Sequence, residues 1–156
     1  MKNLPEKVVE FMRGKGWTCA VAESCTGGGV GAAITSVAGA SEVFAGGVIS
    51  YSNAVKRDVL GVPVGILDAH GAVSGECAAA MAEGVRKVMN VDVAVSVTGI
   101  AGPGGGSAAK PVGLVWFGVA FKGKTFTERC VFGGDRAQIR KQAVDKALSL
   151  LWVEDA

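Results

Sequence analysis

A short apolar segment that runs directly into a glycine-rich turn sets the strongest limit on how this chain folds. Residues 18–22 (TCAVA) are small or β-branched, as in a buried strand. The polar and glycine-rich residues 23–29 (ESCTGGG) follow at once, and residues 30–34 (VGAAI) have the pattern of a helix packed closely on its neighbours. A strand that breaks sharply into a helix is typical of α/β folds, and it leaves backbone N–H groups unpaired at the start of the helix. Such groups can hold an oxyanion or a phosphate oxygen, so this turn is the first candidate for a functional site.

The rest of the chain continues to alternate between strand and helix patterns. The order strand, helix, strand, helix, strand, strand, helix predicts an α/β fold, a single three-layer α/β/α sandwich with a mixed central sheet. We expect strands at 18–23, 44–51, 93–97, 113–121 and 124–132, and helices at 5–14, 26–37, 54–60, 63–67, 75–89 and from a cap at Asp135 to about residue 152.

Length and charge exclude several classes of protein. The chain has 156 residues, the size of one domain, so we treat residues 1–156 as a single domain. The net charge of +2 comes without a dense basic stripe, and we expect no binding of nucleic acid. The longest apolar run, residues 111–121, is too short to span a bilayer, and charged residues stand where a secretory signal needs its apolar core. We therefore expect neither membrane insertion nor export.

Potential metal ligands are few and scattered. The four cysteines form no C-x-x-C pair, and His70 is the only histidine, so we predict no metal, no cofactor and no disulfide framework. Cys19 and Cys130 lie in apolar, strand-like segments and are interpreted as core thiols, as in reduced cytoplasmic proteins. Hydrophobic residues make up 49% of this small chain, which favours burial of one face in a homo-oligomer, a dimer or a trimer.

Two segments match nucleotide-binding motifs only in their residue pattern. Residues 118–125 (GVAFKGKT) fit the P-loop formula, but that motif requires a helix directly afterwards, and residues 126–131 alternate like a strand. Residues 27–32 (GGGVGA) fit the dinucleotide pattern G-x-G-x-x-A, which is a weak signal in a chain with 24 glycines. Neither match predicts a nucleotide-binding fold.

Ser24 in the glycine-rich turn is the candidate nucleophile, although a serine at this point can also serve only as the cap of the next helix. The single histidine lies in a turn between predicted helices, so a lysine is the better base for this serine. We place Lys56 in the first turn of a short helix, where the helix dipole disfavours its positive charge. Tyr51, directly before that helix, could relay the proton or orient the amine. Spacing alone leaves open an ordinary solvated lysine and a strand-end aromatic.

Candidate anion-binding groups lie later in the chain. Arg136 and Arg140 share one face near the start of the last helix, where an anion between them would remove their conflict with the helix dipole. Ion pairs with carboxylates are the alternative. Thr98 and the glycine-rich loop after it either cradle a phosphate or ribose through backbone N–H groups or form a long turn.

Six segments stand out together by their order and spacing. They are residues 22–28 (AESCTGG), 51–53 (YSN) with Lys56, 71–74 (GAVS), 98–103 (TGIAGP), 110–113 (KPVG) and 134–136 (GDR). In this order they resemble one family, the CinA C-terminal domain family of nicotinamide-nucleotide amidohydrolases, and the resemblance extends from about residue 4 to 152. It implies an α/β/α sandwich that hydrolyses the carboxamide of nicotinamide mononucleotide to give nicotinate mononucleotide and ammonia. It also implies no metal or redox cofactor, and a small-molecule nucleotide substrate as the partner.

The resemblance places the family's catalytic serine, tyrosine and lysine on Ser24, Tyr51 and Lys56. The loop departs from the commoner family pattern, because Gly104 and the pair at 108–109 (AA) stand where acidic residues are frequent. A non-catalytic nucleotide-binding or adaptor domain, and an amidase for a related pyridine amide, are the alternative functions. On this basis we expect substrate contacts from Glu23, Cys25, Thr26, Gly27, Gly28, Asn53, Thr98, Gly99, Ala101, Gly102, Arg136 and Arg140.

Overall fold

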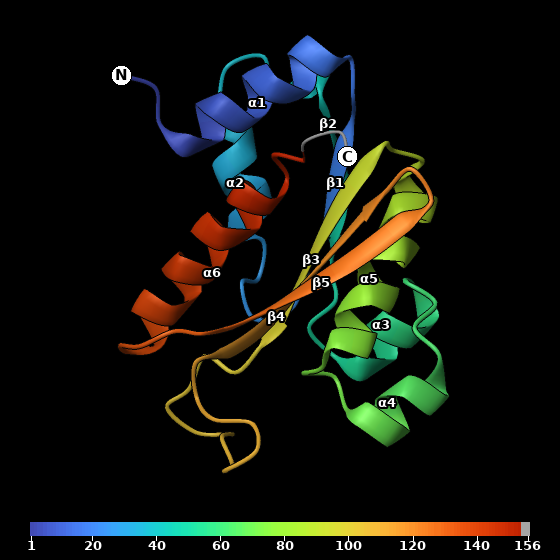
Figure 1. Cartoon of the computed structure of the whole chain (residues 1–156), viewed down its shortest axis with the longest axis vertical. Coiled ribbons are helices and arrows are strands. Elements are labelled where there is room, and N and C mark those ends of the chain that lie inside the picture. The colour runs from blue at the N-terminus through green and yellow to red at the C-terminus, as the bar shows by residue number, and fades with distance from the viewer. Residues whose placement is uncertain (154–156) are drawn as a thin grey trace.

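One five-stranded sheet runs through the computed structural model, which describes residues 1–153 (Figure 1). The strand order is β2-β1-β3-β4-β5. Strand β1 pairs in parallel with β2 and β3, whereas β4 is antiparallel to both β3 and β5. The predicted mixed sheet is therefore confirmed. The strands are β1 (Cys19–Glu23), β2 (Phe44–Ile49), β3 (Val93–Gly99), β4 (Leu114–Phe121) and β5 (Lys124–Val131).

Helices cover both faces of the sheet, which confirms the predicted three-layer sandwich (Figure 1). Helices α1, α2 and α6 pack on one another and on one face, and α5 packs on the other face with α4 beside it. No helix of residues 1–153 is long and apolar enough to cross a bilayer. The helices are α1 (Leu4–Lys15), α2 (Gly29–Thr35), α3 (Asn53–Asp58), α4 (Val64–His70), α5 (Gly75–Met89) and α6 (Arg136–Leu150), with a 3-10 turn at Ala40–Glu42.

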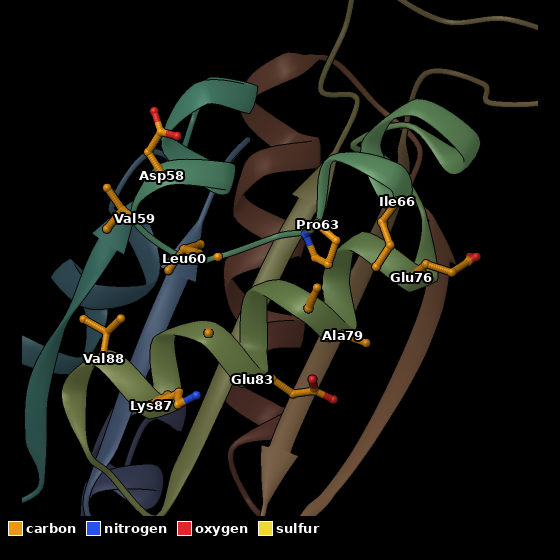
Figure 2. A pocket seen from close by; sticks show the side chains of 13 residues that line it. Asp58, Val59, Leu60, Pro63, Ile66, Glu76, Ala79, Glu83, Lys87 and Val88 are labelled. Carbon is orange, nitrogen blue, oxygen red and sulfur yellow. The ribbon is translucent and has the colours of Figure 1, made fainter.

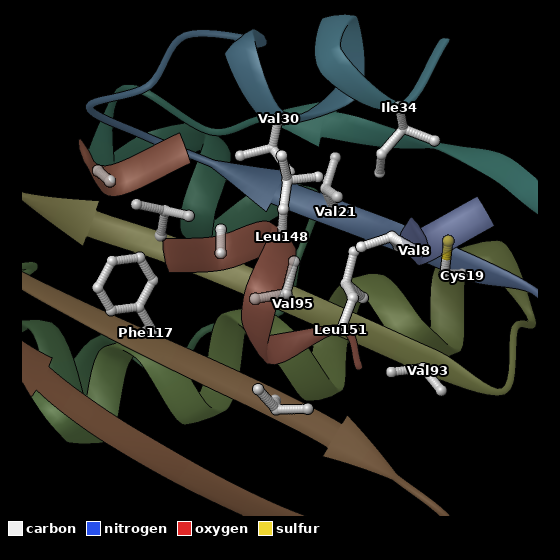
Figure 3. Packing of buried hydrophobic residues seen from close by; sticks show 14 of the residues in the cluster. Val8, Cys19, Val21, Val30, Ile34, Val93, Val95, Phe117, Leu148 and Leu151 are labelled. Atoms are coloured by element: carbon white, nitrogen blue, oxygen red, sulfur yellow. The ribbon is translucent and has the colours of Figure 1, made fainter. Parts of the chain in front are cut away.

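Alternation along the central strand β1 divides the apolar core into two halves. Val21 faces α1, α2 and α6, where it joins Val30 and Leu148 (Figure 3). Its neighbours Ala20 and Ala22 face α5 on the other side. Because successive side chains of a strand point to opposite faces, a central strand buried on both sides is apolar at every position. Small residues on the second face let α5 approach the sheet closely.

Several predicted element bounds differ from the observed ones by a few residues, and at the glycine-rich turn the reason is local. The helix expected from residue 26 begins at Gly29, because Gly27 and Gly28 adopt positive φ angles of 59° and 107° and form a tight turn instead. Left-handed backbone is strain-free for glycine and interrupts a right-handed helix. The strand expected over 44–51 ends at Ile49.

The topology creates a crevice at the carboxyl ends of β1 and β3. From β1 the chain passes through α2 to β2 on one side, whereas from β3 it continues to β4 on the other side. The order of the strands therefore reverses between the adjacent parallel strands β1 and β3, and ligands of open α/β sheets bind at such a switch point. Ser24 follows β1 directly, and the glycine-rich loop follows β3 directly, so both lie at this point.

Candidate active site

The turn that carries Ser24 is anchored by its own backbone. The N–H of Ser24 donates to the carbonyl of Val97 in β3 at 3.0 Å, and the N–H of Gly27 donates back to the carbonyl of Ser24 at 3.1 Å. Ser24 is 7% exposed. The backbone of Ser24 thus makes the last hydrogen bond that links the end of β1 to β3, and its side chain lies at the crevice.

Glu23 closes the N-terminus of α2. Its buried carboxylate accepts hydrogen bonds from the N–H groups of Val30 at 2.8 Å and Gly31 at 3.0 Å. The N–H of Gly29 donates to the carbonyl of Thr26. The expectation that the first amides of this helix are free for a phosphate or an oxyanion is therefore wrong. An acidic side chain already satisfies them and complements the helix dipole.

Lys56 reaches Ser24 across 32 positions of the sequence. Helix α3 starts at a cap formed by Ser52, whose hydroxyl accepts from the N–H of Val55. This start turns Lys56 inward, where it is 1% exposed. Its Nζ lies 3.2 Å from Ser24 Oγ, 2.8 Å from the carbonyl oxygen of Ser50 and 3.2 Å from that of Tyr51. The amine and the hydroxyl that the sequence singled out are therefore in contact.

Burial lowers the pKa of Lys56, because the site withholds the water that would solvate an ammonium ion. The expected contribution of the helix dipole is not supported, since α3 has six residues and Lys56 lies in its last turn. A neutral amine has two N–H groups and one lone pair. With the two N–H groups on the carbonyls of Ser50 and Tyr51, the lone pair is left for the hydroxyl of Ser24.

The neighbouring thiols do not compete as nucleophiles. Burial raises the pKa of Cys25 to about 11, and it also raises the pKa of Cys77. A thiol needs to lose its proton to react, so both stay protonated and inert near neutral pH. Ser24 is thus the hydroxyl that the lysine can activate, and the thiols contribute apolar packing around the amine.

A cavity of about 290 Å³ opens beside Ser24 and Lys56. It brings together nine further residues around the pair: six are predicted substrate contacts, and Tyr51 is a predicted catalytic residue. Ala72 and Val73 line it as well; they fall within the 71–74 segment of the resemblance, but no chemistry of their side chains marked them. The wall consists of Ser24, Cys25, Tyr51, Asn53, Lys56, Ala72, Val73, Thr98, Gly99, Ala101 and Arg136.

Several predicted contacts have other positions or partners. Tyr51 contacts Lys56 through its main-chain carbonyl; the residue lines the cavity and is 65% exposed. The hydroxyl of Thr98 donates to the carbonyl of Ala72 at 2.9 Å and so ties β3 to the loop before α5. The hydroxyl of Thr26 is buried and has no hydrogen-bond partner within residues 1–153. In the described part of the chain, Glu23, Thr26, Gly27, Gly28, Gly102 and Arg140 lie outside the cavity wall.

The two arginines differ in position. Arg136, the first residue of α6, lines the cavity and donates from Nη1 to the carbonyl of Gly102 at 2.8 Å. Arg140 donates to the carbonyls of Cys25 and Thr26 instead. Within residues 1–153 neither forms an ion pair with a carboxylate, which was the alternative for both. The same range contains no group of three or more His, Cys, Asp and Glu side chains that could hold a metal ion.

A larger cavity, of about 720 Å³, lies between α5 and the segment that joins α3 to α4 (Figure 2). Its wall combines apolar side chains such as Leu60 and Ile66 with the carboxylates of Asp58, Glu76 and Glu83. It contains no hydroxyl or thiol beside a base. The smaller cavity at Ser24 is therefore the candidate active site.

Comparison with known proteins finds a matching family and several relatives. The model of the CinA C-terminal domain matches residues 1–154. The chain is 51% identical over 146 residues to nicotinamide-nucleotide amidohydrolase PncC of Enterobacter agglomerans, which covers 91% of this chain and 89% of that protein. It is also 51% identical over 135 residues to a putative competence-damage inducible protein of Moorella thermoacetica, which covers 86% of this chain and 33% of that protein. The chain thus spans about a third of the length of several of the curated relatives it matches.

Solved structures share the whole fold. The crystal structure of competence damage-inducible protein A from Klebsiella pneumoniae superposes with a TM-score of 0.92 at 38% sequence identity, over 96% of this chain and 92% of that one. Competence/damage inducible protein CihA from Agrobacterium tumefaciens gives the same TM-score at 41% identity, over 95% and 91% of the two chains.

Proposed function

Because the chain belongs to the CinA C-terminal domain family, we propose that it is an amidohydrolase that converts nicotinamide mononucleotide to nicotinate mononucleotide and ammonia. The observation that carries this proposal is the buried Lys56 Nζ at 3.2 Å from Ser24 Oγ, on the wall of a cavity. A base at hydrogen-bond distance from a hydroxyl is the arrangement that covalent catalysis by serine requires. The relative named as a nicotinamide-nucleotide amidohydrolase supports the choice of amide.

In the first half of the reaction Lys56 acts as the general base. Its lone pair takes the proton of the Ser24 hydroxyl while Oγ bonds to the carboxamide carbon, and the carbonyl oxygen becomes an oxyanion. The protonated amine then gives this proton to the departing nitrogen, the C–N bond breaks, and ammonia leaves a nicotinoyl ester on Ser24. Tyr51 assists by holding the amine through its carbonyl, and because the residue lines the cavity we assign its phenol the role of a second proton donor.

Backbone amides of the glycine-rich turn supply the oxyanion donors in this mechanism. The N–H groups of Gly27 and Gly29 close the turn and are occupied. In the part of the chain that the structure describes, no acceptor is present for the N–H groups of Cys25, Thr26 and Gly28. Cys25 lines the cavity, so we assign the oxyanion to its N–H and to that of Thr26 directly after it.

The second half repeats the first with water. Lys56 takes a proton from water as its oxygen attacks the ester carbon, the bond to Ser24 Oγ breaks, and the proton returns to Ser24. Nicotinate mononucleotide leaves as the carboxylate, and the proton that its carboxyl group loses is taken up by the ammonia, which becomes ammonium. The cycle thus consumes one water, and its atoms and charges balance.

The size of the cavity fits only part of the substrate. Ligand pockets commonly have volumes of about 300–1,000 Å³, and this cavity is at the lower end of that range. We assign it to the pyridine carboxamide, packed against Ala72 and Val73, with Asn53 and the loop after β3 nearest to the ribose. The phosphate then extends to Arg136, whose guanidinium is the cationic group on the cavity wall beside Lys56.

Ammonia release from nicotinamide mononucleotide by the purified chain tests the proposal. We expect Ser24→Ala to abolish release, and the matched variant Ser41→Ala, at an exposed serine away from the cavity, to keep the wild-type rate. Equal rates from Ser24→Ala and wild type would show that the assignment is wrong. Tight binding of the mononucleotide by wild type without turnover would favour a binding or adaptor domain, and faster turnover of another pyridine amide in competition would change the substrate.

A further inference from the structure

Arg140 holds the nucleophile turn from outside the cavity. Its Nε donates to the carbonyl of Cys25 at 3.1 Å, and its Nη2 donates to the carbonyl of Thr26 at 3.2 Å. The same Nη2 lies 3.5 Å from where a side chain on Gly27 would begin. A single guanidinium from α6 therefore bonds to two consecutive peptide units immediately after Ser24, across more than a hundred positions of sequence.

Because the peptide bond is planar, a hydrogen bond to a carbonyl also fixes the direction of the N–H group in the same peptide unit. The carbonyl of one residue and the N–H of the next belong to one rigid unit and point in opposite directions. When Arg140 holds the carbonyl of Cys25, the N–H of Thr26 is directed away from Arg140. When it holds the carbonyl of Thr26, the N–H of Gly27 is directed away too, and this N–H indeed donates to the carbonyl of Ser24.

The turn needs such an outside support because its own backbone is permissive. Gly27 and Gly28 both have positive φ and carry no side chain that could fix their orientation. Donors for an oxyanion contribute to catalysis only when they are already aimed at its position before the reaction. A guanidinium on the carbonyl side also polarises the peptide units, because a charged donor makes the bonded amide a stronger donor at its other end.

We propose that Arg140 is a positioning residue: its hydrogen bond to the carbonyl of Cys25 aims the N–H of Thr26 at the oxyanion, and its hydrogen bond to the carbonyl of Thr26 holds the N–H of Gly27 on the carbonyl of Ser24. This inference rests on the proposed amidohydrolase function. Arg140 touches the turn and not the cavity, which separates it from Arg136 on the cavity wall. The role differs from the expected one, in which Arg140 binds substrate phosphate directly.

A split between kcat and KM distinguishes the two roles. Arg140→Lys keeps the positive charge but cannot reproduce a planar two-point contact with both carbonyls. We expect Arg140→Lys and Arg140→Ala to lower kcat by about 10- to 100-fold, which is less than the loss of about 10²- to 10³-fold when an oxyanion donor is removed outright, with KM for the mononucleotide changed less than about threefold. Lys141→Met on the same helix, at an exposed lysine paired with Asp145, is the matched control and is expected to keep both constants.

Rescue and amide exchange complete the test. Guanidinium ion at millimolar concentration is expected to restore part of the kcat of Arg140→Ala and to leave the kcat of Lys141→Met unchanged, with thermal melts confirming that each variant is folded. Hydrogen exchange of the Gly27 amide, followed by NMR without substrate, is expected to be faster in Arg140→Lys. A rise in KM at constant kcat, or unchanged kcat and exchange, would overturn the inference. If the wild-type chain releases no ammonia, the proposed function fails, and exchange at Gly27 still decides whether Arg140 holds the turn.

Discussion

Replacement of Lys56 by methionine tests the centre of the mechanism with the least change in shape. Methionine has nearly the length and volume of the lysine stem, so Lys56→Met removes the amine and leaves the side chain packed beside Ser24. The change deletes contacts from Nζ to Ser24 Oγ and to the carbonyls of Ser50 and Tyr51. It introduces no buried charge and opens no large cavity. The variant should therefore separate catalysis from folding.

The expected effect on activity is much larger than the effect on stability. General base catalysis contributes about 10²- to 10⁴-fold, and Lys56 serves both proton transfers, so we expect kcat to fall by about 10⁴, or about 5 kcal/mol in the activation barrier. The carbonyl of the fully buried Ser50 loses a donor, which costs about 1–3 kcal/mol. Burial of an apolar group in place of an amine offsets part of this cost. A net loss of up to about 2 kcal/mol lowers the Tm of a chain of this size by less than about 8 °C.

The pH dependence of stability gives an independent measurement. The pKa of Lys56 is lowered in the folded chain, whereas in the unfolded chain it is near 10.4. Between these two values the unfolded state binds more protons, so the stability of the wild type rises with pH there relative to Lys56→Met. Below the folded pKa both states are protonated and the difference becomes constant.

Urea unfolding of both proteins from pH 6 to 10, together with the pH profile of kcat/KM, measures this directly. We expect the wild-type profile of kcat/KM to rise with pH up to the lowered pKa of the amine and then to level off. Retention of more than a tenth of the wild-type kcat by Lys56→Met would refute the role of the amine as base. A stability difference that does not change with pH would refute the neutral amine.

Three further variants test the surroundings. Tyr51→Phe keeps the carbonyl that holds Lys56, so we expect a fall in kcat of about tenfold or more from loss of the phenol proton alone, with unchanged Tm; wild-type kcat would assign the residue a main-chain role only. Arg136→Ala is expected to raise KM for the mononucleotide at least tenfold and to leave KM for free nicotinamide unchanged, because only the first carries a phosphate. Gly84→Ala is expected to lower the free energy of unfolding by about 1–3 kcal/mol, since its Cβ would lie 2.0 Å from the carbonyl oxygen of Leu60. Its control Gly14→Ala, with open space around the new methyl group, is expected to raise that free energy by up to about 1 kcal/mol, and equal melts of the two would contradict this packing argument.

The local residue pattern was sufficient to predict most of the helices and strands. The helix predicted at 75–89 is α5 (Gly75–Met89), and the predicted cap at Asp135 starts α6 with a reciprocal bond to Gln138. Such features depend on neighbours within one or two turns, so the sequence expresses them directly. The start of α2 was missed because a run of three glycines does not reveal which of them take a left-handed conformation.

The candidate catalytic residues could also be identified from the sequence, because it resembles a family and has no suitably placed histidine. The contact between Lys56 and Ser24 could not be predicted from the sequence, because Lys56 reaches Ser24 only when β2 pairs with β1 and α3 starts beside the end of that pair. The prediction that the helix dipole keeps the amine of Lys56 neutral was wrong. Burial lowers its pKa, and burial is a property of the packed molecule and not of a position within a helix.

The amino-acid sequence by itself determined the layers of this protein, the glycine-rich turn and the residues that can do chemistry there. The tertiary structure decided which polar groups serve that turn. Glu23 caps α2, and Arg140 bonds to two carbonyls more than a hundred positions away. Strand and helix patterns come from contacts between near neighbours in the chain. Donors and acceptors in a site meet only after distant segments have packed, so their pairing cannot be deduced from spacing.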